Sequence, residues 1–68
     1  MMEPRYPELQ IRLSSSNPFV WVSAARLAMR RSRIDSEEIA QFTDEALESD
    51  EPVKMRDVCA RWVRIGLA

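Results

Sequence analysis

Two groups of charged side chains are the residues of this sequence whose type and spacing could support a function. The first, called here the acidic group, consists of four carboxylates: Glu37, Asp44, Glu45 and Glu48. The second, called the arginine group, consists of four guanidinium side chains: Arg26, Arg30, Arg31 and Arg33. Carboxylates can hold a cation or meet a basic surface, and clustered arginines can contact phosphates. The sequence therefore contains two candidate sites of opposite charge.

The sequence contains few side chains of the kinds that usually act in catalysis. The chain has no histidine, which is the commonest general base and a common metal ligand. Cys59 is the only cysteine, and its place on the apolar side of a predicted helix indicates a packed core residue rather than a nucleophile. Gly66 is the only glycine, so a glycine-rich phosphate loop is excluded. We therefore expect no enzyme, and no catalytic, cofactor-binding or metal site.

The acidic group belongs to a segment, residues 35–51, that carries eight carboxylates and no basic residue. Helical spacing spreads these carboxylates over a surface instead of converging them on one cation, and the segment has no EF-hand spacing. The simplest interpretation is a solvated helix face. The functional interpretation is an acidic surface that docks on a basic site of a protein partner, including a site built for nucleic acid.

The arginine group is the basis of a DNA-binding hypothesis. Arg26, Arg30 and Arg33 recur at spacings of four and three residues, which predicts a basic stripe along one helix. Against DNA, the chain has 10 basic and 11 acidic residues and a pI of about 5.3, and the nearby carboxylates would repel phosphate. A third interpretation is a network of ion pairs between the arginine helix and the acidic helix.

The elements that position these groups follow from periodicity and capping signals. Residues 9–13 alternate apolar and polar side chains, which predicts a strand with Gln10 and Arg12 outward. Asn17 and Pro18 mark a helix start, and we expect that helix to end at Arg31 or Ser32. The helix has apolar residues on more than one side. One side carries Phe19, Val20, Ser23, Leu27 and Ile34, and a further side carries Trp21, Ala25 and Ala28.

A second and a third helix follow. Asp35 with Glu38 resembles a capping box, so the second helix begins there. Its predicted inner face consists of Ile39, Phe42, Thr43, Ala46 and Leu47. The third helix covers residues 52–62, because Pro52 is tolerated only in a first turn. Its predicted apolar face consists of Met55, Val58, Cys59 and Trp62. Residues 63–67 alternate again and are predicted to pair with the first strand.

These elements predict a mainly helical α+β fold, a compact three-helix domain with one or two short terminal strands in the order β-α-α-α-β. Residues 1–68 form a single domain in which residues 1–7 are a flexible N-terminus. On folding, a chain near 60 residues buries only about 60% of the surface that its unfolded form exposes. A homodimer that buries an apolar face would increase the buried core. A single cysteine, no signal peptide and no run of about 18 apolar residues indicate a cytoplasmic protein without a membrane partner.

Three short motifs resemble those of a known family: Asn-Pro-Phe at 17–19, Arg-Leu-Ala-Met-Arg-Arg at 26–31, and Glu-Glu-Ile-Ala-Gln-Phe-Thr at 37–43. The sequence resembles small uncharacterised proteins of actinobacterial genomes, bacteriophages and other mobile elements. That family has a strand, a Gly-Asn-Ala-Phe segment, a helix ending in paired arginines, an acidic Glu-Glu-(Ile/Val) helix and a C-terminal helix closing on an aromatic residue. The resemblance covers residues 9–65. Ser16 and Arg33 replace glycines of the family, so we expect a different turn after the first helix.

We therefore predict a small non-enzymatic protein-binding module of phage or mobile-element type that inhibits or regulates a protein partner through the acidic group. Its most specific version is an anti-CRISPR or other anti-defence inhibitor that occupies a nucleic-acid-binding surface of its partner. The alternative is a small DNA-binding transcriptional regulator. It would use either the arginine group or, as ribbon-helix-helix repressors do, the outward residues of a strand, here Gln10 and Arg12.

Overall fold

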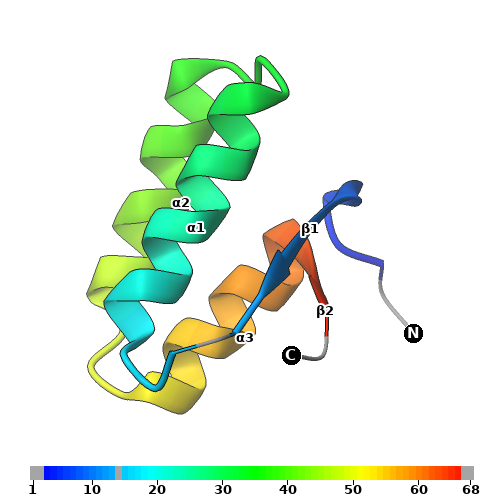
Figure 1. Ribbon diagram of the computed structural model, residues 1–68. Coiled ribbons are helices and arrows are strands. Elements are labelled where there is room, and N and C mark those ends of the chain that lie inside the picture. Colours follow the sequence, from blue (N-terminus) through cyan, green and yellow to red (C-terminus); the bar gives the residue numbers. More distant parts are fainter. Residues whose placement is uncertain (1–2, 14, 67–68) are drawn as a thin grey trace.

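The computed structural model describes residues 3–13 and 15–66 (Figure 1). The elements are β1 (Tyr6–Arg12), α1 (Pro18–Arg31), α2 (Ser36–Glu48), α3 (Pro52–Trp62) and β2 (Val63–Gly66). This is the predicted β-α-α-α-β order of a small, mainly helical α+β domain. Helices α1 and α2 lie side by side as a hairpin, and α3 crosses one end of it (Figure 1). β1 packs against α1, and β2 packs against α3.

Helix α1 begins as its capping residues predict. The Asn17 side-chain oxygen accepts a hydrogen bond from the Phe19 N–H at 3.0 Å, and Pro18 occupies the first helical position. Both features lower the number of unsatisfied N–H groups at the helix end. They fix the start of α1 at the residue that the sequence predicts.

The turn after α1 takes the form that a glycine would favour. Arg33 has a φ of 61°, in the left-handed region, and its N–H donates to the Arg30 carbonyl oxygen at 3.1 Å. The Ile34 N–H reaches back to the Met29 carbonyl oxygen at 3.0 Å. A left-handed conformation is usual just after a helix, although a side chain there costs about 1–2 kcal/mol. Arg33 therefore adopts the left-handed conformation although it carries a side chain.

Helix α2 is capped by Asp35 as predicted, but the full capping box does not form. The Asp35 carboxylate accepts a hydrogen bond from the Glu37 N–H at 3.4 Å. The Glu38 carboxylate, which would complete the box, instead accepts a hydrogen bond from the Tyr6 hydroxyl at 2.8 Å and pairs with Arg5. Glu38 thus joins α2 to the N-terminal strand rather than capping its own helix.

The first and last elements form a two-stranded parallel sheet. Ile11 pairs with Ile65, and the register is irregular between Tyr6 and Gln10. Leu9 and Ile11 are buried while the residues between and after them are exposed, which confirms the predicted alternation. β1 starts three residues earlier than predicted. The pairing of the C-terminal strand is confirmed as far as Gly66, and the rest of that prediction, at residue 67, lies outside the described residues.

The core faces of α2 and α3 largely match the periodicity. All four predicted residues of α3 are buried, and so are Ile39, Phe42 and Ala46 of α2. Thr43 is half-buried and donates its hydroxyl to the Ile39 carbonyl oxygen at 2.8 Å. The prediction is wrong for Leu47, which is 55% exposed. Leu47 instead lines an open hollow together with Phe19 of α1.

Helix α1 buries only one of its apolar sides. Its buried residues are Val22, Ala25 and Met29. The side that carries Phe19, Val20 and Leu27 faces solvent. The fully buried Ala25 adds little bulk between helices, which favours this rotation of α1. The helix therefore offers a second, exposed apolar side.

Trp62 lies at the centre of the contacts between the N-terminal segment and the helices. Its ring packs edge-on against Phe42, with 5.8 Å between centroids, and lies 6.2 Å from the Tyr6 ring. The Arg5 guanidinium lies 5.0 Å from the centroid of the Trp62 ring and pairs with Glu38 at 2.7 Å. Burial, and then the hydrogen bond to Glu38, raise the pKa of Tyr6. Arg5 and Tyr6 lie in the segment predicted to be flexible, of which residues 3–7 are described.

Candidate functional site

Three of the four residues of the acidic group share one exposed side of α2. Glu37, Asp44 and Glu48 are exposed, and helical periodicity places them opposite the buried Phe42. Glu45 differs, because it is half-buried and its carboxylate accepts a hydrogen bond from the Trp62 indole N–H at 2.9 Å. We call Glu37, Asp44 and Glu48 the acidic face. Glu45 instead contacts the core, because it holds the buried Trp62 by this hydrogen bond.

The arginine group does not form the continuous stripe that its spacing predicts. Arg26 and Arg30 lie one turn apart on the side of α1 that faces α2. Arg31 points about 100° further round the helix. Arg33 lies beyond the last helical residue, in the left-handed turn. Two arginines therefore share a surface, and the other two lie elsewhere.

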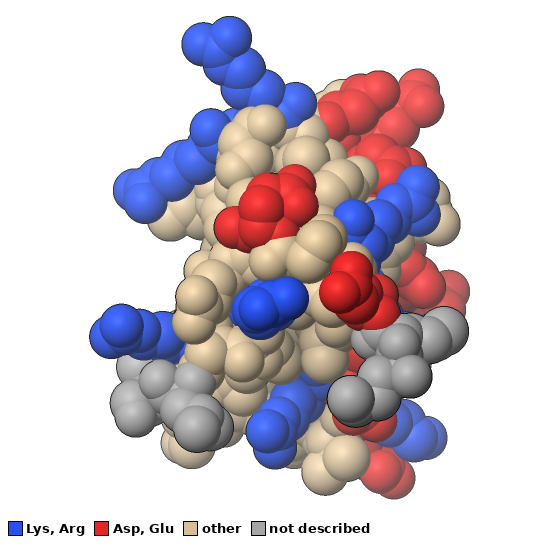
Figure 2. All heavy atoms as spheres, turned by 90° about the vertical axis from the view of Figure 1, so that its right-hand side faces the viewer, with Lys and Arg blue, Asp and Glu red and all other residues tan. Residues whose placement is uncertain are grey.

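The predicted ion-pair network between α1 and α2 is not formed by the described residues. In residues 3–13 and 15–66 the ion pairs are Arg5 with Glu38 and the exposed pair of Lys54 with Asp50. Neither pair involves the arginine group or the acidic face. In Figure 2, several Lys and Arg side chains project along the left side of the molecule, whereas Asp and Glu lie at the centre and toward the right with further basic side chains among them. The two charged surfaces therefore remain available to a partner.

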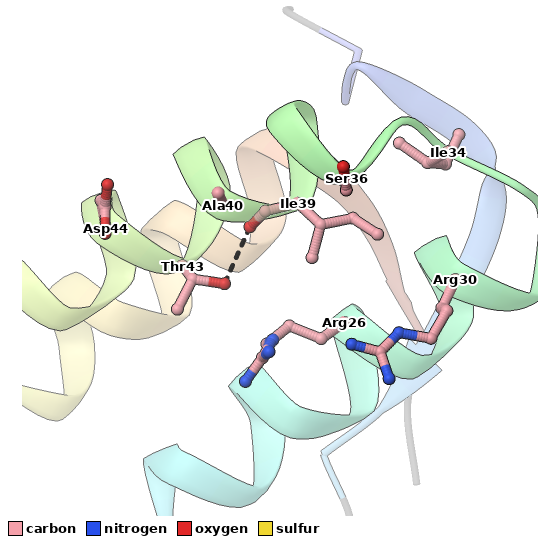
Figure 3. A pocket seen from close by; sticks show the side chains of 8 residues that line it. All are labelled: Arg26, Arg30, Ile34, Ser36, Ile39, Ala40, Thr43 and Asp44. Carbon is pink, nitrogen blue, oxygen red and sulfur yellow. Dashed lines mark hydrogen bonds between the residues drawn. The ribbon is translucent and has the colours of Figure 1, made fainter.

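A groove of about 360 Å³ separates the outer sides of α1 and α2 (Figure 3). Arg26 and Arg30 of α1 form one wall. Ile39 and Ala40 of α2 supply apolar surface on the other side, with Asp44 at one end of the row. We call this hollow the basic groove. It can accept an apolar side chain accompanied by negative charge.

A second hollow of about 280 Å³ lies at the other end of the hairpin, where α2 leads into α3. Phe19 and Leu47, which are 59% and 55% exposed, contribute its apolar surface. Asp50 and Glu51 lie at its rim. We call this hollow the acidic pocket. The sequence analysis missed it, and the surplus apolar side of α1 was the signal that could have indicated it.

Potential metal ligands and the one cysteine thiol were the remaining candidate groups in residues 3–13 and 15–66. They contain no group of three or more His, Cys, Asp or Glu residues that could hold a metal ion. Burial raises the pKa of Cys59 to about 11, so its thiol stays protonated near neutral pH. The Trp21 indole N–H is also engaged, since it donates to the Ser15 carbonyl oxygen at 2.6 Å. The exposed surfaces of α1 and α2 carry charged and apolar side chains.

Comparisons with protein-family models, curated proteins and solved structures find no match for this chain. In the part of the chain that the structure describes, no helix is long and apolar enough to cross a membrane. The geometry of α1 and α2 and the charges that they carry are therefore the basis for a proposed function.

Cys59 is expected to react slowly with iodoacetamide in the native protein at neutral pH. Its side chain is fully buried and its pKa is raised, so both access and thiolate formation require unfolding. The folded state holds its proton to higher pH than the unfolded state does. The free energy of unfolding should therefore fall as the pH rises from about 9 toward 11, because the unfolded state loses this proton more readily.

The measurement is the alkylation rate by mass spectrometry, in buffer and in urea. The rate should rise steeply across the unfolding transition. Rapid alkylation in buffer with loss of a binding activity would contradict the assignment of Cys59 to the core.

Proposed function

We propose that the protein is a small non-enzymatic protein-binding module and that the acidic face of α2 is its binding surface. The observation that carries the proposal is that Glu37, Asp44 and Glu48 are exposed together and that none of them pairs with a described basic side chain. Exposed charge of one sign on a helix attracts a partner surface of the opposite sign and speeds the encounter. The partner is therefore a protein with a basic surface.

The acidic face is held rigidly, which favours binding. On the opposite side of α2, Ile39, Phe42 and Ala46 are buried against the rest of the core. The helix therefore needs no ordering when a partner arrives, and less conformational entropy is lost on association. Rigid placement of three carboxylates also gives selectivity, because a partner must present its cations at matching positions.

A narrower form of the proposal is an inhibitor, such as an anti-CRISPR protein, that covers the nucleic-acid-binding surface of its partner. It is supported by the sign of the charge and by the resemblance to proteins of phages and mobile elements. In this form the acidic face would occupy the positions where phosphates bind, so nucleic acid would compete with the protein for its partner.

The alternative function, a small DNA-binding regulator, has one favourable observation. Gln10 and Arg12 are exposed on β1, as contact with base edges would require. However, one edge of β1 is occupied by β2 of the same chain. Arg26 and Arg30 also share their groove with Asp44, which repels phosphate. Titration of random duplex DNA at two salt concentrations tests this function, and we expect no salt-dependent binding.

Charge reversal of the acidic face tests the proposed function. The Glu37→Lys, Asp44→Lys, Glu48→Lys triple variant should fold, because exposed substitutions change stability by within about 0.5 kcal/mol each. It should fail to retain the proteins that the wild-type chain captures from lysate of its native host, since like charges in an interface cost several kcal/mol. Circular dichroism confirms the fold, and mass spectrometry identifies the captured proteins.

The matched control is the Arg26→Glu, Arg30→Glu variant, which reverses charge on the neighbouring helix. It should capture the same proteins as the wild type. If the arginine variant loses them and the lysine variant keeps them, the working surface is the arginine side of α1 and the proposed surface is wrong.

A further inference from the structure

The basic groove and the acidic pocket lie on the same side of the α1–α2 hairpin. Phe19 is seven residues from Arg26 and eleven from Arg30, so the three side chains project from one side of α1. Leu47 is four residues from Thr43, which lines the basic groove from α2. The hairpin therefore presents one continuous face with a hollow toward each end.

The two hollows carry opposite charges. The basic groove lies toward the end of the hairpin where α1 leads into α2, and its two arginines, Arg26 and Arg30, outnumber its one carboxylate, Asp44. The acidic pocket lies where α2 leads into α3, and its rim carries Glu51 and Asp50, of which Asp50 also pairs with Lys54. Each hollow also has apolar surface next to its charges. The face therefore has a positive end and a negative end.

Consider a twofold axis that lies in the plane of this face, passes through its middle and runs perpendicular to the two helices. Such an axis brings the faces of two copies together with their ends reversed. It lays the basic groove of one copy over the acidic pocket of a second copy, and the reverse contact forms at the other end. Phe19, which is 59% exposed, then enters the basic groove of the second copy beside Ile39 and Ala40. Asp50 and Glu51 of each copy meet the arginines of the other. Both contacts are complementary in charge.

We propose that the protein forms a symmetric homodimer through this α1–α2 face, with Phe19 of each copy as the apolar anchor. An isologous contact of this kind uses the same patch on both copies and closes at two subunits. It also covers apolar side chains that a domain of this size cannot bury by itself. The dimer goes beyond the proposed function, and self-association of the purified chain is measured without any other protein.

Sedimentation equilibrium of the purified protein tests the dimer. The wild-type chain should reach twice its mass of 7.9 kDa, and added salt should weaken the association because charged contacts hold the two ends. Phe19→Lys should raise the dissociation constant by about a hundredfold or more, as for a buried aromatic anchor, because it places an ammonium group beside two arginines. Val20→Lys is the matched control and should stay dimeric, because Val20 is also exposed but points about 100° further round α1 than Phe19 and lines neither hollow.

A charge exchange makes the test specific for this geometry. The Arg26→Glu, Arg30→Glu variant should be monomeric, because both of its contacts join carboxylates to carboxylates. The Asp50→Lys, Glu51→Lys variant should also be monomeric, because both of its contacts join cations to cations. An equimolar mixture of the two should form a heterodimer, in which both contacts are complementary again.

Two results would overturn the proposal. One is a wild-type chain that remains monomeric at the concentrations used for NMR spectroscopy. The other is a mixture of the two charge variants that stays monomeric although the wild type is dimeric. If the wild type is monomeric and Phe19→Lys abolishes capture of another protein, the face belongs to that protein instead of a second copy.

Discussion

The Trp62→Ala variant is expected to be largely unfolded at 25 °C. Trp62 is buried against Phe42 and Tyr6, and truncation of a buried tryptophan costs about 3–5 kcal/mol. At roughly 0.05–0.15 kcal/mol per residue, a domain of this length has a total stability of about 3–10 kcal/mol. The lost packing is thus comparable with the whole free energy of unfolding. Far-UV circular dichroism and urea titration measure the effect.

Two further variants separate the contributions of Trp62. Trp62→Phe keeps an aromatic ring in the core and removes the N–H that donates to Glu45, so it should fold with reduced stability. Trp21→Ala removes the other tryptophan, which is only half-buried, and should cost less than Trp62→Ala. A Trp62→Ala protein that melts within about 5 °C of the wild type would contradict the central place given to this residue.

Glu45→Lys is expected to destabilise the protein by about 1–3 kcal/mol, whereas Glu48→Lys should change stability by within about 0.5 kcal/mol. The two glutamates lie three residues apart on α2 and the substitutions change charge equally. Only Glu45 accepts the Trp62 indole N–H, and a lysine there would leave that donor without an acceptor. For a domain of this size, 1 kcal/mol lowers the melting temperature by about 4–8 °C.

The conservative variant Glu45→Gln distinguishes the hydrogen bond from the charge. A glutamine retains a side-chain oxygen that can accept the indole N–H, so most of the lost stability should return. Equal effects of Glu45→Lys and Glu48→Lys on the melting temperature would show that the Trp62 contact does not stabilise the fold. Glu45 would then belong with the acidic face after all.

The local features of the fold follow from the sequence, because each has a local cause. Asn17 and Pro18 set the start of α1, and the apolar spacing of α3 gives its buried side correctly. The rotation of α1 could not be predicted in the same way. Periodicity showed that this helix has apolar residues on several sides, but which side is buried depends on how closely α2, α3 and β1 approach. The fully buried Ala25 marks the chosen side.

The sequence predicts the charges of the candidate site, but not which of its residues share a surface or where the hollows lie. The acidic and basic segments are evident in the sequence, and three of the four carboxylates do lie together on α2. Glu45 could not be separated from them, because its partner Trp62 is 17 residues away in another helix. The acidic pocket combines residues from three helices, so the surplus apolar side of α1 indicates one of its walls but not the pocket itself.

The parallel pairing of β1 with β2 sets an order for folding. The three helices depend on local contacts and on their neighbours in the chain, whereas the sheet joins Ile11 to Ile65 and must wait until both ends meet. A chain that stops before Val63, on the ribosome or after proteolysis, would leave the apolar side chains of Leu9 and Ile11 on a strand without its partner. Such an unpaired edge is a site where chains aggregate. We therefore expect that addition of β2 lowers the tendency of the nascent chain to aggregate through this edge of β1.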